Sequence, residues 1–161
     1  MGESQLNKSF GLEAEMIDWA GRFALALRDG ERSLIVALAG DLGSGKTTWA
    51  RAMLRGLGYA GRVPSPTYTL LEHYALRGLD IVHLDLYRLS GDAELENLGL
   101  RDWLARPATW LLVEWPERAP ELAARADLVV AFTEPPGGGR NVRLDAQTPA
   151  GIEALERARQ L

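Results

Sequence analysis

Eight consecutive residues, Gly40–Thr47, have the residue types and the spacing of a phosphate-binding loop. Their sequence, GDLGSGKT, matches the pattern G-x-x-x-x-G-K-[ST] and follows a continuous apolar run. Glycines let such a loop curl until its backbone N–H groups point into one concavity, and the next helix adds the positive end of its dipole. The segment therefore predicts a site for the phosphates of a nucleotide.

Two side chains at the end of this loop have separate predicted roles. The Lys46 ammonium is expected to reach the β- and γ-phosphates of ATP, and the Thr47 hydroxyl is expected to bind Mg²⁺. Lys8 and Lys46 are the only lysines among 18 basic residues, and a slender lysine enters a phosphate cradle more easily than a forked arginine. The predicted ATP-binding residues are Asp41, Leu42, Gly43, Ser44, Gly45, Lys46, Thr47 and Thr48.

Two later apolar runs, Ile81–Asp85 and Trp110–Glu114, each end in a carboxylate. A P-loop site needs an acidic residue at the end of a second strand to hold Mg²⁺ directly or through water. Asp85 and Glu114 are therefore both predicted to act in metal binding and, with Lys46, in catalysis. The sequence leaves open which carboxylate binds the metal and which positions the attacking water.

A short segment, Ser65–Thr69, lies between the P-loop helix and the first of these carboxylates. Hydroxyl groups in that interval often sense the γ-phosphate, so Ser65 and Thr67 are predicted to be switch-like. A proline-stiffened turn entering a strand explains the same sequence equally well. His83 alternates with apolar neighbours and is predicted to be a core histidine, and Trp115 either lines the nucleotide pocket or packs in the core.

The elements that must position these residues alternate between helix and strand. Predicted helices are Leu12–Arg28, Lys46–Leu57, Asp92–Leu104 (as one or two short helices) and Pro149–Arg159. Predicted strands are Ser33–Ala39, Thr67–Tyr74, Asp80–Leu86, Thr109–Glu114, Asp127–Thr133 and Asn141–Leu144. We expect an α/β P-loop NTPase fold with a mainly parallel sheet, helices on both faces and one antiparallel hairpin. With no repeat and no long linker, residues 1–161 are expected to form a single domain.

Composition narrows the range of functions. The chain has no cysteine and only two histidines, which excludes disulfides, thiol nucleophiles and cysteine-ligated zinc. A net charge of −4 argues against direct binding to DNA or unaided binding to RNA, because such binding needs basic surface. The chain has no apolar stretch of the ~18 residues that a membrane span requires and no secretory signal, so we expect a cytoplasmic protein.

Four segments in this order resemble one family. They are Gly40–Thr48, Ser65–Thr69, His83–Leu89 (HLDLYRL) and Glu114–Glu117 (EWPE). Together they are similar to the TsaE family, bacterial ATPases of tRNA threonylcarbamoyladenosine synthesis. The resemblance extends from the first predicted helix to about Phe132, and the last three segments are more specific to this family than the P-loop is.

The resemblance implies a small α/β fold that binds Mg-ATP and hydrolyses it weakly when alone. It also implies action with TsaB and TsaD, the proteins that transfer threonylcarbamoyl to tRNA, so that tRNA is reached only through the complex. Lys46 and Thr47 take the phosphate and Mg²⁺ roles. Thr67, Asp85 and Glu114 fall in the other three segments.

Three other functions fit a P-loop chain of this size. A small-molecule kinase needs an arginine-bearing lid, and the glycine-rich stretch at 137–140 offers only Arg140. A GTPase needs an Asn-Lys-x-Asp segment, which this sequence lacks. A nucleotide-sensing assembly factor would bind ATP without depending on its hydrolysis. The kinase is the main alternative to the partner-dependent ATPase.

Overall fold

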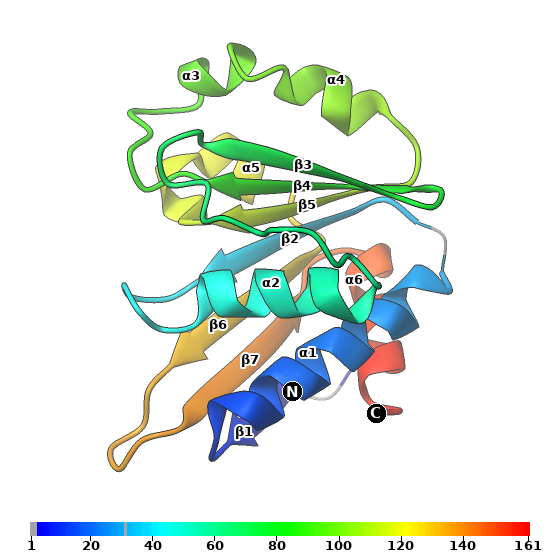
Figure 1. Cartoon of the computed structure of the whole chain (residues 1–161), viewed down its shortest axis with the longest axis vertical. Coiled ribbons are helices and arrows are strands. Elements are labelled where there is room, and N and C mark those ends of the chain that lie inside the picture. The colour runs from blue at the N-terminus through cyan, green and yellow to red at the C-terminus, as the bar shows by residue number, and fades with distance from the viewer. Residues whose placement is uncertain (1–2, 31) are drawn as a thin grey trace.

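The computed structural model describes residues 3–30 and 32–161. The strands are β1 (Gln5–Phe10), β2 (Leu34–Ala39), β3 (Leu71–Leu76), β4 (Leu79–Asp85), β5 (Thr109–Glu114), β6 (Leu128–Thr133) and β7 (Arg140–Ala146). The helices are α1 (Glu13–Arg28), α2 (Lys46–Gly56), α3 (Ala93–Glu96), α4 (Leu100–Ala105), α5 (Pro120–Ala123) and α6 (Pro149–Ala158), with a 3₁₀ helix, η1 (Pro116–Arg118). Figure 1 shows how they are arranged.

All seven strands form one sheet in the order β1-β7-β6-β2-β5-β4-β3. The four inner strands, β6, β2, β5 and β4, run parallel, and their sequences are nearly continuous apolar runs. The edges are antiparallel: β3 pairs with β4, and β7 lies between β6 and β1. The predicted α/β fold is therefore confirmed, including its parallel centre and the hairpin, which is β3–β4.

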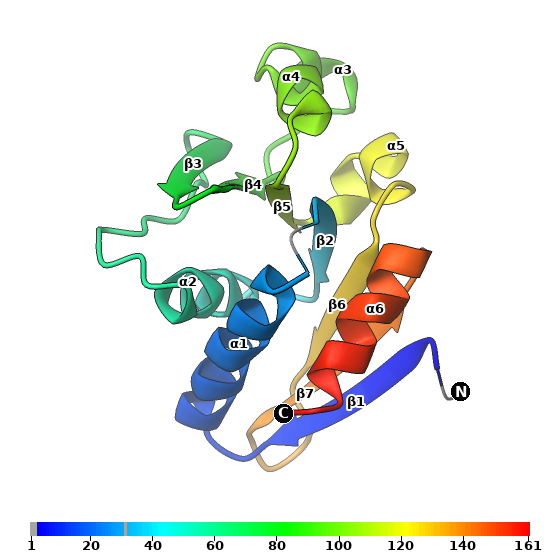
Figure 2. The same ribbon diagram turned by 90° about the vertical axis from the view of Figure 1, so that its right-hand side faces the viewer.

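Helices cover both faces of the central sheet, as predicted. One core, built around Trp19, Phe23, Trp49 and Phe132, lies between the sheet and the α1, α2 and α6 helices. A second, smaller core of leucine and valine lies between β4 and β5 and the short helices α3, α4 and α5. Figure 2 shows α1 and α2 on one side of the sheet and α5 on the other. Among the described residues, no helix is long and apolar enough to span a membrane.

Two features at the sheet edges differ from the prediction. The N-terminal segment was expected only to lack a signal sequence, yet Gln5–Phe10 forms edge strand β1, paired with β7. Only Phe10 of this strand is buried, and the other residues are half-buried or exposed and mostly polar, so no apolar run marks it. The strand predicted from Thr67 begins only at Leu71, because residues 67–70 form a turn in which the Leu70 N–H bonds to the Pro66 carbonyl at 2.7 Å and Leu70 has a φ of 65°.

The strand order brings the predicted site residues together at the carboxyl ends of the parallel strands. β5 pairs directly with β2, and β4 pairs with β5 on its other side. Asp85 and Glu114, the last residues of β4 and β5, are register partners. The P-loop follows the carboxyl end of β2, which points the same way as the ends of β4 and β5. Both carboxylates therefore lie on the same side of the sheet as the P-loop.

Candidate nucleotide-binding site

The loop between β2 and α2 has the backbone conformation that its glycines predict (Figure 1). Gly43 and Gly45 have φ values of 76° and 119°, which are strained for any residue with a side chain. At Gly40, a Cβ atom would lie 2.5 Å from the Ser44 hydroxyl oxygen and 3.0 Å from the Phe132 carbonyl oxygen. The loop is therefore a backbone cradle in which Gly40 has no space for a side chain, while Gly43 and Gly45 are required by their backbone conformation.

Lys46 is folded back over this cradle. Its ammonium donates hydrogen bonds to the carbonyl oxygens of Gly40 and Asp41 at 2.6 and 2.8 Å. The same nitrogen lies 4.0 Å from the centroid of the Trp115 ring, so Trp115 covers the loop. Burial lowers the pKa of the Lys46 ammonium, while nearby carboxylates, led by Glu114, act in the opposite direction. Lys46 is thus a buried cation whose direct hydrogen-bond partners are neutral.

Thr47 joins the loop to the end of β5. Its hydroxyl contacts both oxygens of the Glu114 carboxylate, at 2.7 and 2.9 Å. The Glu114 side chain is only 3% exposed, and its Oε2 also lies 2.6 Å from Nε2 of the fully buried His83. Glu114 therefore sits in a chain of hydrogen bonds that runs from the P-loop helix into the core.

Asp85 has a different set of partners. Its Oδ2 accepts a hydrogen bond from the Thr67 hydroxyl at 3.2 Å, and its Oδ1 accepts one from the backbone N–H of Tyr87 at 3.0 Å. Thr67 in turn contacts the Ser65 hydroxyl at 2.8 Å. Ser65–Thr69, called the switch segment below, is thus connected to Asp85, while Glu114 is the carboxylate bonded to Thr47.

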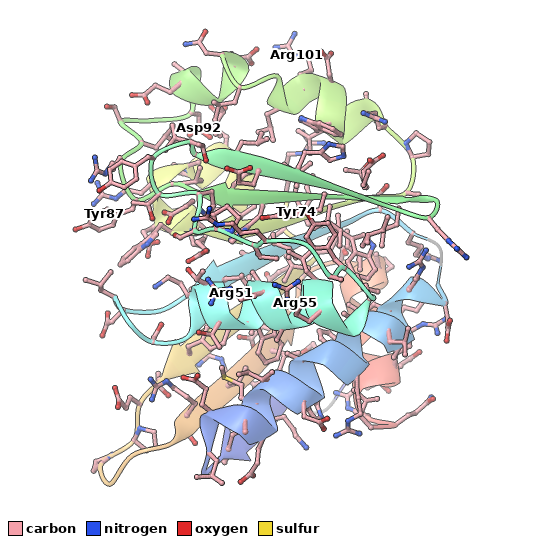
Figure 3. All side chains as sticks on the ribbon, in the orientation of Figure 1. Arg51, Arg55, Tyr74, Tyr87, Asp92 and Arg101 are labelled. Carbon is pink, nitrogen blue, oxygen red and sulfur yellow. The ribbon has the colours of Figure 1, made fainter. Side chains whose placement is uncertain are left out.

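The switch segment is tied to the P-loop helix through the chain that precedes it. Arg51 and Arg55 of α2, labelled in Figure 3, donate hydrogen bonds to carbonyl oxygens of this stretch. Arg51 binds Val63 at 3.3 Å, and Arg55 binds Tyr59 at 2.8 Å. The stretch that leads into the switch segment is therefore held against α2.

The remaining predicted loop residues have diverse surroundings. Leu42 is 81% exposed at the tip of the loop, so its side chain contributes little to a phosphate site. Ser44 is buried, and its hydroxyl has no hydrogen-bond partner within residues 3–30 and 32–161. A buried hydroxyl without a partner is unusual and fits a site that a polar ligand completes.

The donors present fit a nucleotide with Mg²⁺ better than a metal ion alone. The described part of the chain contains no group of three or more His, Cys, Asp or Glu side chains that could hold a metal. Mg²⁺ is usually held by one or two carboxylates together with phosphate oxygens and water. Thr47 and Glu114, bonded to each other beside the cradle, are suited to that arrangement.

Sequence reasoning missed two contacts at this site. His83 is buried as predicted, but its bond to Glu114 depends on β4 and β5 being neighbours, which no local pattern reveals. Arg140, considered only as a lid residue, donates to the Ser44 carbonyl oxygen at 2.8 Å from the opposite side of the loop. Neither contact has a sequence signal apart from the residue type.

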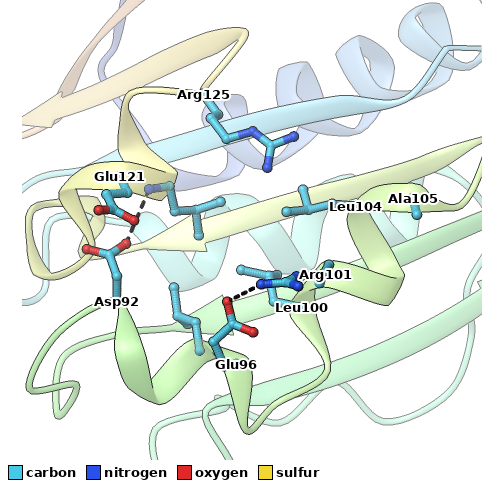
Figure 4. A pocket seen from close by; sticks show the side chains of 10 residues that line it. Asp92, Glu96, Leu100, Arg101, Leu104, Ala105, Glu121 and Arg125 are labelled. Carbon is cyan, nitrogen blue, oxygen red and sulfur yellow. Dashed lines mark hydrogen bonds and ion pairs between the residues drawn. The ribbon is translucent and has the colours of Figure 1, made fainter.

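A separate pocket of about 410 Å³ lies between α3, α4 and α5 (Figure 4). Leu100, Leu104 and Leu122 contribute apolar walls, and the Arg101–Glu96 ion pair at 2.9 Å lies on its rim. None of the predicted site residues lines this pocket. The residues for which the sequence predicts chemistry therefore all lie near the P-loop, at the carboxyl ends of the central strands.

Comparisons with known proteins agree with the arrangement of these segments. The family model for the threonylcarbamoyl adenosine biosynthesis protein TsaE matches residues 11–142. The protein of that name from Haemophilus influenzae is 42% identical over 141 residues, which cover 86% of this chain and 88% of that protein. The one from Borreliella burgdorferi is 32% identical, covering 84% and 96%.

A solved structure supports the fold independently. The crystal structure of Bacillus subtilis YdiB superposes with a TM-score of 0.77, covering 97% of this chain and 95% of that chain at 23% sequence identity. At that identity the similarity demonstrates the shared fold alone. From the family match and the two relatives, the chain belongs to the TsaE family of threonylcarbamoyl adenosine biosynthesis proteins.

Proposed function

We propose that this chain binds Mg-ATP and hydrolyses it in the cytoplasm, and that this ATPase is needed for threonylcarbamoyladenosine modification of tRNA. The observation that carries the proposal is the bond between the P-loop hydroxyl of Thr47 and the strand-end carboxylate of Glu114, at 2.7 Å. In P-loop NTPases the equivalent hydroxyl and carboxylate hold Mg²⁺ beside the phosphates.

The residues of the loop supply the phosphate site. Lys46, which donates to the carbonyl oxygens of Gly40 and Asp41, would bind phosphate oxygens instead, because these carry charge and are stronger acceptors. The N-terminus of α2, beginning at Lys46, adds its dipole. Mg-ATP, when bound, supplies a terminal phosphoryl group whose charge the metal partly neutralises.

The two carboxylates have different proposed tasks. Glu114 is the metal-side carboxylate, because Thr47 already bonds to it and His83 keeps its second oxygen in place. Asp85 is bonded to Thr67 of the switch segment, so it is suited to positioning water and to relaying the presence of the γ-phosphate. Trp115 excludes water from the Lys46 side of the cradle.

Partners are part of the proposal. A net charge of −4 makes this chain poorly suited to bind tRNA directly, because the phosphates of RNA require basic side chains. We therefore assign RNA contact and threonylcarbamoyl transfer to TsaB- and TsaD-like proteins, with this chain using ATP to dock, reset or release them. Hydrolysis by the isolated chain is then slow and rises when the partners are added.

The test compares Lys46→Ala with Lys8→Ala, its control at the only other lysine. Lys46→Ala should abolish hydrolysis and weaken ATP binding while the fold survives, and it should fail to restore threonylcarbamoyladenosine in a strain that lacks the gene. Lys8→Ala should behave like the wild type in all three measurements. Wild-type turnover by Lys46→Ala would contradict the proposal. Rapid phosphorylation of a small metabolite without partners would favour the kinase instead.

A further inference from the structure

Arg140, the first residue of β7, holds the phosphate-binding loop by its backbone. Its Nε donates a hydrogen bond to the Ser44 carbonyl oxygen at 2.8 Å, and its Nη2 donates one to the Gly43 carbonyl oxygen at 3.3 Å. The residues joined by these contacts are 96 and 97 positions apart in the sequence. The contacts thus connect the far, antiparallel part of the sheet to the cradle.

The guanidinium group is itself fixed in place. Its Nη1 donates to the carbonyl oxygen of Gly139 at 2.8 Å and lies 3.3 Å from the Glu134 carboxylate. The Arg140 side chain is only 21% exposed, whereas that of Glu134 is 62% exposed. A planar guanidinium with several donors can bind two neighbouring carbonyl oxygens at once, which an ammonium group does less well.

These contacts determine which way two peptide groups of the loop face. In a trans peptide the carbonyl oxygen and the N–H hydrogen point in opposite directions. Because Arg140 binds the carbonyl oxygens of Gly43 and Ser44, the N–H groups of Ser44 and Gly45 face away from it. The Ser44 N–H donates to the Asp41 carbonyl oxygen at 3.1 Å, the same oxygen that accepts from Lys46.

The Asp41 carbonyl oxygen therefore accepts hydrogen bonds from two donors, the Lys46 ammonium and the Ser44 N–H. These are the donor types that a P-loop presents to phosphate oxygens. With Arg140 holding the outer side of the loop, the donors on its inner side are arranged before any anion arrives. Such arrangement in advance reduces the ordering cost of binding.

The neighbouring strand supports the loop at its other end. A Cβ atom at Gly40 would lie 3.0 Å from the Phe132 carbonyl oxygen, and one at Gly45 would lie 3.7 Å from the Phe132 ring. β6 ends at Thr133 and β7 begins at Arg140, so both supports come from one hairpin. The hairpin thus forms the outer wall of the cradle.

We propose that Arg140 is a positioning residue for nucleotide binding, which keeps the Gly43–Ser44 and Ser44–Gly45 peptides oriented so that the inward-facing N–H groups of Ser44 and Gly45 donate to the phosphates. The inference rests on the proposed ATP-binding function and deepens it. Arg140 touches the loop backbone, not the γ-phosphate, so its contribution is the same for ADP and for ATP. A lid arginine acting on the γ-phosphate would instead affect ATP and its hydrolysis.

The experiment uses Arg140→Met, which keeps a long apolar side chain and removes every donor. Its control is Arg143→Met on the same strand, where the arginine pairs with Asp145 at 2.7 Å and does not contact the loop. Dissociation constants for Mg-ADP and for a non-hydrolysable ATP analogue are measured by titration calorimetry. Unfolding temperatures are measured without nucleotide.

We expect Arg140→Met to raise the dissociation constants of both nucleotides about tenfold, which is equivalent to about 1.4 kcal/mol of binding free energy. Arg140→Lys should recover part of that loss, because one ammonium can replace one of the two carbonyl contacts. Glu134→Gln should have a smaller effect than Arg140→Met, since it removes only the exposed support of the guanidinium. Arg143→Met should bind both nucleotides like the wild type.

Two results would overturn the inference. Unchanged dissociation constants with a lowered unfolding temperature would show that Arg140 is only structural. A loss of affinity confined to the ATP analogue would show that Arg140 acts on the γ-phosphate. If the wild-type chain itself bound neither nucleotide, the proposed function would fail, and that result is distinct from both.

Discussion

The ends of β5 and β4 carry the same chemistry in different settings. Each strand ends in a carboxylate that binds a threonine hydroxyl: Glu114 binds Thr47, and Asp85 binds Thr67. Thr47 lies in α2, and Glu114 is also bonded to the buried His83. Thr67 lies instead in the switch segment, where Ser65 and Tyr68 are exposed.

The difference shows that two neighbouring strand ends can combine a fixed site, at Glu114, with an adjustable one, at Asp85. Partners of Glu114 belong to a helix and a central strand, which cannot move without disturbing a packed core. The hydroxyl partner of Asp85 belongs to a turn, and turns change position at lower cost. We infer that the Glu114 side holds the metal and that the Asp85 side responds to what is bound.

The largest expected effect comes from removing the charge on each carboxylate in turn. Glu114→Gln should lower partner-stimulated hydrolysis by about 100-fold or more, the size of effect found when one preorganised electrostatic group is lost. It should also make ATP affinity nearly independent of Mg²⁺. Asp85→Asn should reduce hydrolysis while keeping the Mg²⁺ dependence of binding. ATPase assays and ATP titrations across a range of Mg²⁺ concentrations measure both effects.

Glu121→Gln, at an exposed position of α5 that lines the pocket of Figure 4, is the control for the change of charge. It should leave hydrolysis and Mg²⁺ dependence unaltered. If Asp85→Asn, rather than Glu114→Gln, removed the Mg²⁺ dependence, the assignment of the two strand ends would have to be reversed.

Much of the fixed half of this comparison could be predicted because its signals are local. The P-loop is one uninterrupted segment, and the strands that end at Glu114 and Asp85 are mostly apolar. The motif therefore located the loop and the helix, and the apolar runs located the strands. Both carboxylates are candidates on the sequence alone, because each ends an apolar strand.

The remainder depends on which strands become neighbours. The bond between Thr47 and Glu114 requires β5 to pair with β2, and the contact of Arg140 requires β7 to lie beyond β6. Strand order is a property of the whole sheet, so no local pattern encodes it. Edge strand β1 was missed for a related reason: its outer side has no strand to pair with, and its polar side chains remain partly in water.

A smaller effect is expected from the adjustable half. Thr67→Ala removes the hydroxyl that joins Asp85 to Ser65. The affinity for the proposed TsaB- and TsaD-like partners should then differ less between the ATP-bound and the ADP-bound chain. A ligand shifts an equilibrium only through its different affinity for the two states. We expect the ratio of partner affinities with ATP and with ADP to shrink by about fivefold, a typical coupling between sites.

Thr69→Ala is the matched control, since Thr69 lies in the same segment but bonds to Glu72 at 3.0 Å. Its affinity ratio should equal that of the wild type. The comparison is measured by binding the partner pair to immobilised protein in the presence of each nucleotide. If both variants reduced the affinity ratio equally, the segment would contribute to partner binding by direct contact and not through Asp85.

The smallest effect is a dependence on pH that arises from Lys46, within the fixed half. Burial lowers the pKa of its ammonium from the value of 10.5 for a free lysine. Bound phosphates favour the charged form, so the pKa of Lys46 in the complex lies above that in the free protein. The contribution of Lys46 to nucleotide affinity should therefore be constant below its lowered pKa. It should fall as the pH rises above that pKa, approaching tenfold per pH unit between the two pKa values.

The stability of the free protein should change in the opposite direction in the same range. Between the lowered pKa of folded Lys46 and its ordinary value, the unfolded chain binds more protons, so the free energy of unfolding rises with pH. Lys46→Met should lack this contribution, and the difference between its pH profile and that of the wild type isolates it from other groups. Calorimetric ADP titrations and urea unfolding at matched pH values supply the two curves. A nucleotide affinity that stayed constant up to pH 10.5 would mean that the Lys46 charge does not contribute to phosphate binding.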